Sequence, residues 1–297
     1  MFEGFEEHNI RVGDVDIACV VGGTGPAVLM LHGAPQTHAM WHKIAPNLAR
    51  SFTVVAADLR GYGDSSKPTS GADHAEYSFR AMALDQVRLM SALDHERFAV
   101  VAHDRGARVA HRLLLDHPER VFGASILDVL PTEYNYSHVT RELATAYWHW
   151  FAFIQPAPLP EDLITPAAVK FLHHVLNSFG SSSSVFAPEA MAEYERCFSD
   201  PQMIHAMCED YRAAASIDLE HDRESRDQRV ECPLQIIWGS AGVVGQLFDP
   251  LAVWREYASD VRGSSVDAGH FLAEQQPDQT FELLNDFLSS LTPKASH

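Results

Sequence analysis

Short apolar runs alternate with longer, periodic segments along much of the chain. We expect strands in six of these runs, at residues 15–21, 27–31, 52–57, 98–102, 124–128 and 234–238. Residues 79–93 place an apolar or long side chain on each successive turn, which predicts a helix between the third and fourth runs. Strand, helix and strand in this order predict parallel pairing through right-handed crossovers.

The pattern changes between residues 132 and 223. This region is rich in aromatic residues and histidine, and a proline-rich stretch at 155–160 interrupts it, so we expect helices joined by loops. The serine run at 181–184 is expected to be a loop. We therefore predict an α/β fold in which residues 1–131 and 224–297 form a mostly parallel twisted sheet flanked by helices, with 132–223 as a helical cap. A cap over the carboxyl ends of the strands would enclose a ligand pocket.

Composition and charge narrow the classes of partner. A length of 297 residues fits one core with one subdomain, and a composition of 46% hydrophobic and 21% charged residues argues against global disorder. There are 22 Lys and Arg residues against 40 Asp and Glu residues, a formal charge of −18. This charge disfavours nucleic acid and anionic membranes, because both bind clustered positive charge. A small anionic substrate remains compatible, since surface charge is screened beyond about 10 Å.

Neither the N-terminal stretch nor the cysteines indicate secretion or a metal site. The sequence MFEGFEEHN lacks the basic-then-apolar pattern of a signal peptide, and no apolar run approaches the ~20 residues that span a bilayer. The four cysteines have no CxxC spacing, so we expect reduced thiols in a cytoplasmic protein. The adjacent His173 and His174 would point about 100° apart on a helix, which is poor geometry for sharing one ion.

A candidate nucleophile follows the strand at 98–102. The residues His-Asp-Arg-Gly-Ala-Arg at 103–108 lead directly into a helix, at the sharp turn where α/β-hydrolases commonly carry G-x-S-x-G. Asp104 occupies the nucleophile position, and Gly106 permits close approach of the backbone. A carboxylate there can displace a leaving group from sp³ carbon and form an ester. The alternative is that Asp104 only caps the helix.

The loop His-Gly-Ala-Pro at 32–35 follows the strand at 27–31. In this fold that loop supplies one backbone N–H of the oxyanion hole, and the residue after the nucleophile supplies the other. The backbone amides of Ala34 and Arg105 are therefore the candidates. The alternative is that glycine and proline are present only because the turn requires them.

The base and its orienting acid are expected later in the chain. His270 lies in the run Asp-Ala-Gly-His-Phe at 267–271, after the last strand-like run, and suits a general base. The run at 240–245 contains no carboxylate, and the first one after it is Asp249. Asp128 ends an earlier strand, and we prefer it to Asp249 as the acid that orients His270.

Two further groups surround the candidate nucleophile. Arg105 and Arg108 are three residues apart on one helix, so both can face Asp104, keep it ionised and bind a substrate carboxylate. The alternative for one of these two arginines is that it only forms a structural ion pair. The run at 146–151 combines N–H and O–H donors with aromatic rings, which suits binding of a departing halide. The alternative is an aromatic core inside the cap.

The sequence resembles the fluoroacetate (haloacetate) dehalogenases of the α/β-hydrolase superfamily over nearly its whole length. The shared motifs are HGAPQ at 32–36, ADLRGYGDS at 57–65, HDRGAR at 103–108, YWHW at 147–150, DYRAAASIDLEHD at 210–222 and GHF at 269–271. Haloalkane dehalogenases typically have tryptophan after the nucleophile, and epoxide hydrolases need two cap tyrosines. Arg105 fits neither pattern.

The resemblance implies a role for each candidate residue and suggests a homodimer. Asp104, Asp128 and His270 would form the catalytic triad, and Arg105 and Arg108 the carboxylate clamp. The halide would be held by His149, Trp150 and Tyr211. The chain departs from the family where an aromatic residue is replaced by Ala34 and a tryptophan by Ser181, and both changes would enlarge the pocket.

We therefore expect hydrolytic dehalogenation of a small 2-haloacid, most simply haloacetate, to the 2-hydroxy acid through an aspartyl ester. No metal and no organic cofactor is needed for this reaction. One alternative is an epoxide hydrolase, for which Tyr147 and Tyr211 are the available pair of acids. Another is a ligand receptor on a hydrolase scaffold.

Overall fold

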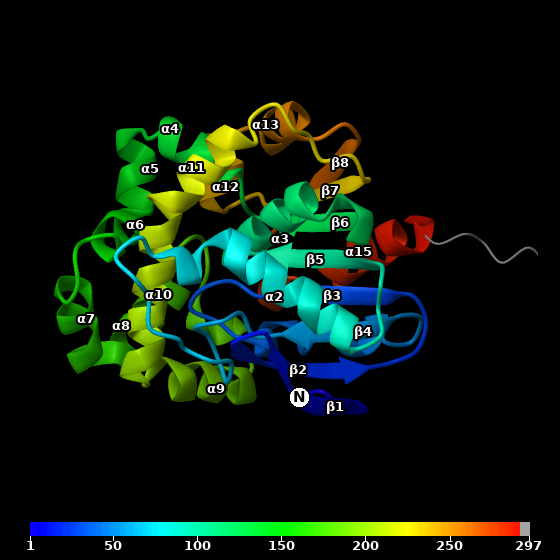
Figure 1. The fold of residues 1–297 in the computed structure, drawn as a ribbon, viewed down its shortest axis with the longest axis horizontal. Helices are drawn as coiled ribbons and strands as arrows, with labels where there is room; N and C mark the ends of the chain where they lie inside the picture. The colour runs from blue at the N-terminus through cyan, green and yellow to red at the C-terminus, as the bar shows by residue number, and fades with distance from the viewer. Residues whose placement is uncertain (292–297) are drawn as a thin grey trace, which may run out of the picture.

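The computed structural model describes residues 1–291 and is built on one eight-stranded sheet (Figure 1). The strand order across the sheet is β1-β2-β4-β3-β5-β6-β7-β8. The strands are β1 (Phe5–Val12), β2 (Val15–Gly22), β3 (Ala27–Leu31), β4 (Thr53–Ala57), β5 (Phe98–His103), β6 (Val121–Leu127), β7 (Leu234–Gly239) and β8 (Val261–Val266). Strands β3 to β8 pair in parallel, whereas β2 is antiparallel to both β1 and β4.

The central strands are apolar because helices cover both faces of the sheet. Every residue of β3 and β5 is buried, as expected for strands in the middle of a parallel sheet. The helices packed around the sheet are α1 (Ala45–Leu48), α2 (Phe79–Ala92), α3 (Asp104–Asp116), α12 (Val243–Leu247), α13 (Pro250–Tyr257), α14 (Leu272–Gln275) and α15 (Pro277–Leu291). The Ser78 side chain caps α2 by accepting a hydrogen bond from the backbone N–H of Ala81.

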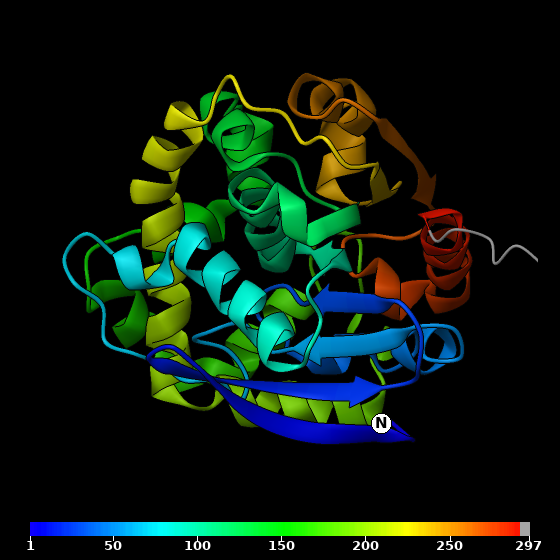
Figure 2. The same cartoon turned by 45° about the vertical axis from the view of Figure 1, so that its right-hand side comes forward.

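All the chain between β6 and β7 forms a group of helices, which we call the helical segment. Its members are α4 (Thr132–Ser137), α5 (Arg141–Ala146), α6 (Trp148–Phe153), α7 (Leu159–Ile164), α8 (Ala168–Leu176), α9 (Pro188–Phe198), α10 (Pro201–Ala214) and α11 (Ile217–Glu224). Figures 1 and 2 show these helices gathered beyond the carboxyl ends of the parallel strands. The serine run expected to be a loop includes the start of a short 3₁₀ turn, Ser183–Val185.

The predicted fold class is confirmed, and the six predicted strands are all present. The sequence pattern did not predict the two edge strands, β1 and β8, whose residues are mostly exposed or partly buried. Residues 13 and 14 join β1 to β2 in a tight turn, with Gly13 at a φ of 69°, and this short connection requires antiparallel pairing. Residues 292–297 of the predicted core lie outside the described residues. None of the helices within residues 1–291 is long and apolar enough to cross a membrane.

Candidate active site

Asp104 lies at a strained turn between β5 and α3. Its φ is 46°, a conformation that costs a non-glycine residue roughly 1–3 kcal/mol and is found mainly where function requires it. Glycine is required on both sides of this turn. A Cβ on Gly106 would lie 2.5 Å from the backbone oxygen of His32, and a Cβ on Gly33 would lie 2.6 Å from the Asp104 Cβ. The turn therefore presents the Asp104 carboxylate at the end of the sheet.

The Asp104 carboxylate is buried and held by charge and hydrogen bonding. Its Oδ2 accepts a hydrogen bond of 3.1 Å from the backbone N–H of Ala34, and its Oδ1 lies 4.0 Å from His270 Nε2. Burial alone would raise the pKa of Asp104, but the neighbouring histidines and arginines, His270 foremost, hold this pKa below its usual value. The N-cap of α3 is His103, so Asp104 does not have the helix-capping role that was its alternative interpretation.

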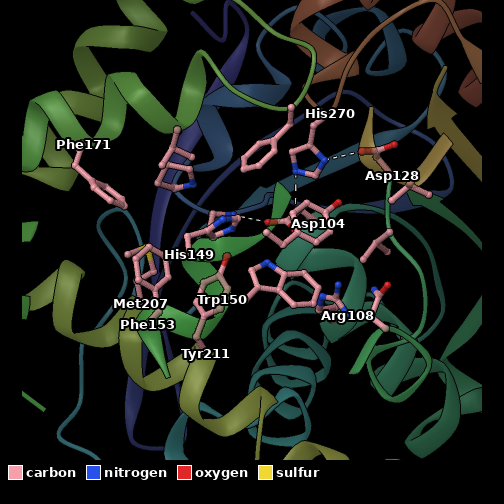
Figure 3. Close-up of a pocket in the computed structure, with 18 residues that line it drawn as sticks. Asp104, Arg108, Asp128, His149, Trp150, Phe153, Phe171, Met207, Tyr211 and His270 are labelled. Carbon is pink, nitrogen blue, oxygen red and sulfur yellow. Dashed lines mark hydrogen bonds and ion pairs between the residues drawn. The ribbon is translucent and has the colours of Figure 1, made fainter. Parts of the chain in front are cut away.

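His270 and Asp128 form the expected contact. His270 Nδ1 donates a hydrogen bond of 2.6 Å to Asp128 Oδ2, which leaves Nε2 directed at Asp104 (Figure 3). Asp128 Oδ1 accepts a 3.0 Å hydrogen bond from the backbone N–H of Gly239, which fixes the carboxylate at the end of β6. Burial lowers the pKa of His270, but the Asp128 and Asp104 carboxylates outweigh this effect, so the pKa of His270 lies above its ordinary value. Asp249, the alternative acid, instead caps α13.

His103 is a residue of this site that the sequence reading did not assign. Its Nε2 donates a hydrogen bond of 2.9 Å to the backbone oxygen of His270, and the two imidazole rings lie 4.5 Å apart. Burial lowers the pKa of His103 to about 3, so the ring is neutral. His103 thereby anchors the loop that carries His270. Its position directly before the candidate nucleophile was the available signal.

Arg108 has no carboxylate partner among residues 1–291. Its guanidinium is buried, and Nη1 donates to two neutral groups, Thr132 Oγ1 at 3.0 Å and the backbone oxygen of Leu130 at 3.3 Å. Nε makes no hydrogen bond. Burial, followed by the charge of Arg105, lowers the pKa of Arg108. A buried guanidinium that lines a cavity and makes no direct ion pair, with Asp104 as a more distant opposite charge, can bind an anion.

The guanidinium of Arg105 is bound to a carboxylate of the protein, whereas we expected both guanidinium groups to be free to bind substrate. Its Nε donates to Asp210 Oδ2 at 2.9 Å, and its Nη2 donates to Asp210 Oδ1 and to the Asp210 backbone oxygen. Asp210 also accepts a 2.6 Å hydrogen bond from the Tyr62 hydroxyl. The guanidinium lies over the rings of Phe79 and Tyr211, and Arg105 is not among the residues that line the cavity. Asp210 thus neutralises one of the two charges, and the role of Arg105 as a substrate ligand stays a prediction.

A cavity of about 30 Å³ joins these groups. Asp104, Asp128, His270 and Arg108 line it, together with the predicted halide ligands His149, Trp150 and Tyr211. The Tyr211 hydroxyl points toward His149 and Asp104 (Figure 3). Ala34 also lines the cavity, whereas Ser181 does not, so only the first of the two departures lies on its wall.

The three predicted halide ligands are neutral hydrogen-bond donors. Burial lowers the pKa of His149 to about 3, and its Nδ1 makes no hydrogen bond. Burial first, and then the charge of Asp104, raises the pKa of Tyr211 well above its ordinary value. The Trp150 indole stacks on the Tyr147 ring at 4.7 Å and lies 4.8 Å below the Arg108 guanidinium. Within residues 1–291, no group of three or more His, Cys, Asp or Glu side chains is arranged to hold a metal ion.

The chain is similar to proteins of known class along nearly its full length. The family described as "alpha/beta hydrolase fold" matches residues 26–277. A fluoroacetate dehalogenase from Burkholderia sp. is 48% identical over 97% of this chain and 95% of that protein. A soluble epoxide hydrolase from Corynebacterium sp. (strain C12) is 31% identical over 96% of this chain and 97% of that protein. Among solved structures, a Nostoc sp. PCC 7120 protein described as an α/β hydrolase has a TM-score of 0.96 and 53% identity, over 97% of this chain and 99% of that one.

Proposed function

Because the chain belongs to the α/β-hydrolase fold family and is a homologue of fluoroacetate dehalogenase, we propose that it hydrolyses the carbon–halogen bond of haloacetate or another small 2-haloacid. The resemblance inferred from the motifs is thereby confirmed. The product is the corresponding 2-hydroxy acid, which is glycolate when the substrate is haloacetate.

The unpaired Arg108 is the observation that carries this proposal. A carboxylate bound to Arg108 would supply the missing counter-ion and place the substrate beside Asp104, since both residues line one cavity. A neutral haloalkane would leave Arg108 without a direct ion pair, and formation of the ester would remove the charge of Asp104 as well. The charge of Arg108 therefore indicates the substrate class, and the carboxylate of Asp104 indicates the reaction.

In the first step, Asp104 Oδ1 attacks the halogen-bearing carbon from the side opposite the halide. The C–halogen bond breaks as the ester bond to Asp104 forms. The halide accepts hydrogen bonds from Tyr211, His149 and Trp150, which are neutral donors fixed in place before the reaction. No base is needed, because the lowered pKa of Asp104 keeps it ionised.

In the second step, water attacks the carbonyl carbon of the ester. His270 Nε2 takes a proton from this water, and Asp128 stabilises the resulting imidazolium through its hydrogen bond to Nδ1. The carbonyl oxygen is Asp104 Oδ2, to which the Ala34 N–H already donates. The Arg105 amide is the second proposed donor to this oxyanion.

We also propose a division of the chain by role, with residues 1–131 and 224–297 as the core and 132–223 as a cap. In support, the core contributes Asp104, Asp128 and His270, while the helical segment contributes the proposed halide ligands. A cytoplasmic location fits the four cysteines, which are all free thiols. A homodimer stays a prediction from the resemblance.

Release of halide from fluoroacetate and chloroacetate tests the function directly. We expect stoichiometric halide and glycolate from at least one of the two, measured by an ion-selective electrode and by chromatography. The amide of chloroacetic acid is the control, because it keeps the reacting carbon but lacks the charge that binds Arg108. Absence of halide release from both acids would refute the proposal.

Replacement of Trp150 by phenylalanine should affect fluoride more than chloride. The ring face beneath Arg108 is kept, but the indole N–H is lost. Fluoride is the poorest leaving group and the strongest hydrogen-bond acceptor, and one preorganised donor is worth roughly 3 kcal/mol, or about 10²-fold in rate. We expect defluorination to fall by that order while dechlorination falls about tenfold or less.

The exposed Trp148, on the same helix, provides the matched control. Trp148→Phe should leave both rates at the wild-type level. Equal losses on the two substrates in Trp150→Phe would show that the indole N–H does not bind the halide.

A further inference from the structure

Tyr211 can transfer a proton, which a departing halide does not require. Its hydroxyl lies at the cavity and points toward His149 and Asp104, on the side of the proposed leaving group (Figure 3). A halide leaves as a stable anion and needs only hydrogen bonds. A phenol can in addition transfer its proton completely to a basic leaving group.

The neighbouring groups suit such a transfer. The Arg105 guanidinium lies 4.2 Å from the centre of the Tyr211 ring and favours the phenolate, while its partner Asp210 opposes it. The charge of Asp104, which also opposes the phenolate, disappears when Asp104 becomes an ester. His149 is neutral and can donate a hydrogen bond, but it carries no spare proton, because burial lowers its pKa to about 3. Tyr211 itself keeps its proton at neutral pH, since its own pKa is raised.

We propose that the same cavity also hydrolyses small epoxides that carry a carboxylate, the oxirane-2-carboxylates, with Tyr211 as the acid that protonates the ring oxygen. This activity rests on the proposed function, because it uses the same nucleophile, base and carboxylate site. It differs from epoxide hydrolysis in general, since Arg108 selects for the acid and against neutral epoxides.

The fit follows from the likeness between the two substrates. Oxirane-2-carboxylate is a haloacetate in which the leaving atom is oxygen and is tied back to the reacting carbon through one CH₂ group. With the carboxylate at Arg108 and C2 facing Asp104, the ring oxygen takes the place of the halide beside Tyr211. The additional CH₂ then faces the apolar end of the cavity, where Phe153 and Met207 lie away from Arg108 (Figure 3).

The reaction balances without a cofactor. Asp104 forms a bond to C2, the C2–O bond breaks, and the oxygen remaining on C3 takes the proton of Tyr211. Water activated by His270 then hydrolyses the ester, the C2 oxygen receives the proton held by His270, and the proton left by the new Asp104 carboxylic acid restores Tyr211 through solvent. The sum is oxirane-2-carboxylate plus water to glycerate. No net proton is released, whereas dehalogenation releases one proton with each halide.

The experiment compares a haloacid, a charged epoxide and a neutral epoxide on one enzyme preparation. Wild-type protein is incubated with bromoacetate, with each enantiomer of oxirane-2-carboxylate, and with oxirane-2-carboxamide, which has the same shape but no charge. We expect bromide release, glycerate from at least one enantiomer with inversion at C2, and at least 100-fold slower hydrolysis of the amide. A pH-stat should record acid production with bromoacetate only.

Bromide release without glycerate formation would overturn this inference and leave the dehalogenase proposal intact. Failure of bromoacetate as well would refute the shared proposal. Hydrolysis of the amide at the rate of the acid would remove Arg108 from substrate selection. Retention of configuration at C2 would place the attack at C3 and overturn the assigned geometry.

Tyr211→Phe separates the acid from a merely structural role. Because bromide leaves without a proton, this variant should lose at least 100-fold in kcat on the epoxide and about tenfold or less on bromoacetate. Tyr134→Phe, at a half-buried ring outside the cavity, is the matched control and should retain both activities. Equal losses on the two substrates in Tyr211→Phe would show that Tyr211 is not the acid.

Discussion

Replacement of His270 by alanine should allow one halide to leave per active site and then stop turnover. Displacement by Asp104 needs no base, whereas hydrolysis of the ester needs the proton acceptor that lies 4.0 Å from Asp104. We expect steady-state turnover to fall by on the order of 10³-fold or more, with a burst of halide equal to the enzyme concentration. Mass spectrometry should find the glycolyl ester on the peptide that contains Asp104.

Isotope labelling checks the same mechanism in the unmodified enzyme. A single turnover in ¹⁸O-labelled water, with enzyme in excess, should place the label in Asp104 and leave most of the product unlabelled. The control for His270→Ala is His174→Ala, at an exposed histidine of α8, which should show full turnover and no ester adduct. Label in the product of the first turnover, with Asp104 unlabelled, would show that His270 directs water at the substrate carbon instead.

Replacement of Arg108 by lysine should lower kcat/KM by on the order of ten- to a thousandfold. The charge is kept, but the planar fork that binds two carboxylate oxygens is lost, and a misplaced carboxylate also misaligns the attack at the neighbouring carbon. The present contacts to Thr132 and Leu130 are made by a guanidinium nitrogen that lysine cannot place in the same way. Steady-state kinetics on chloroacetate measures the loss.

The control for this substitution is Arg141→Lys, at a side chain that is 89% exposed, and it should behave as the wild type. Wild-type kinetics in Arg108→Lys would remove Arg108 from the substrate site. A fall in kcat/KM that is equal for chloroacetate and its neutral amide would assign Arg108 a structural role.

The proximity of Asp104, Asp128 and His270 was predictable because the fold places strand ends together. Asp104 and Asp128 directly follow the neighbouring strands β5 and β6, and both have positive φ at the same edge of the sheet. Apolar runs identify such strands, so the position of a carboxylate immediately after a run carries spatial information. The edge strand β1 gave no such signal, because its exposed residues are polar and its pattern is that of a surface segment.

The partner of Arg105 was not predictable in the same way. Asp210 is 105 residues away in the sequence, and whether it reaches Arg105 depends on how α10 packs on α3. The helical spacing of Arg105 and Arg108 correctly indicated that both lie near Asp104, but it carries no information on what binds each guanidinium. That information lies in the packing of the helical segment on the sheet.

The pairing of Arg105 with Asp210 also restricts how substrate reaches the cavity. Arg105 belongs to α3 and Asp210 to α10, so a swing of the helical segment away from the sheet would separate two buried charges. Such a swing would break the hydrogen bonds from the Arg105 guanidinium to Asp210 and the bond from the Tyr62 hydroxyl to the same carboxylate. We therefore expect substrate to pass through small movements of side chains and loops at the cavity wall, with α10 staying against α3.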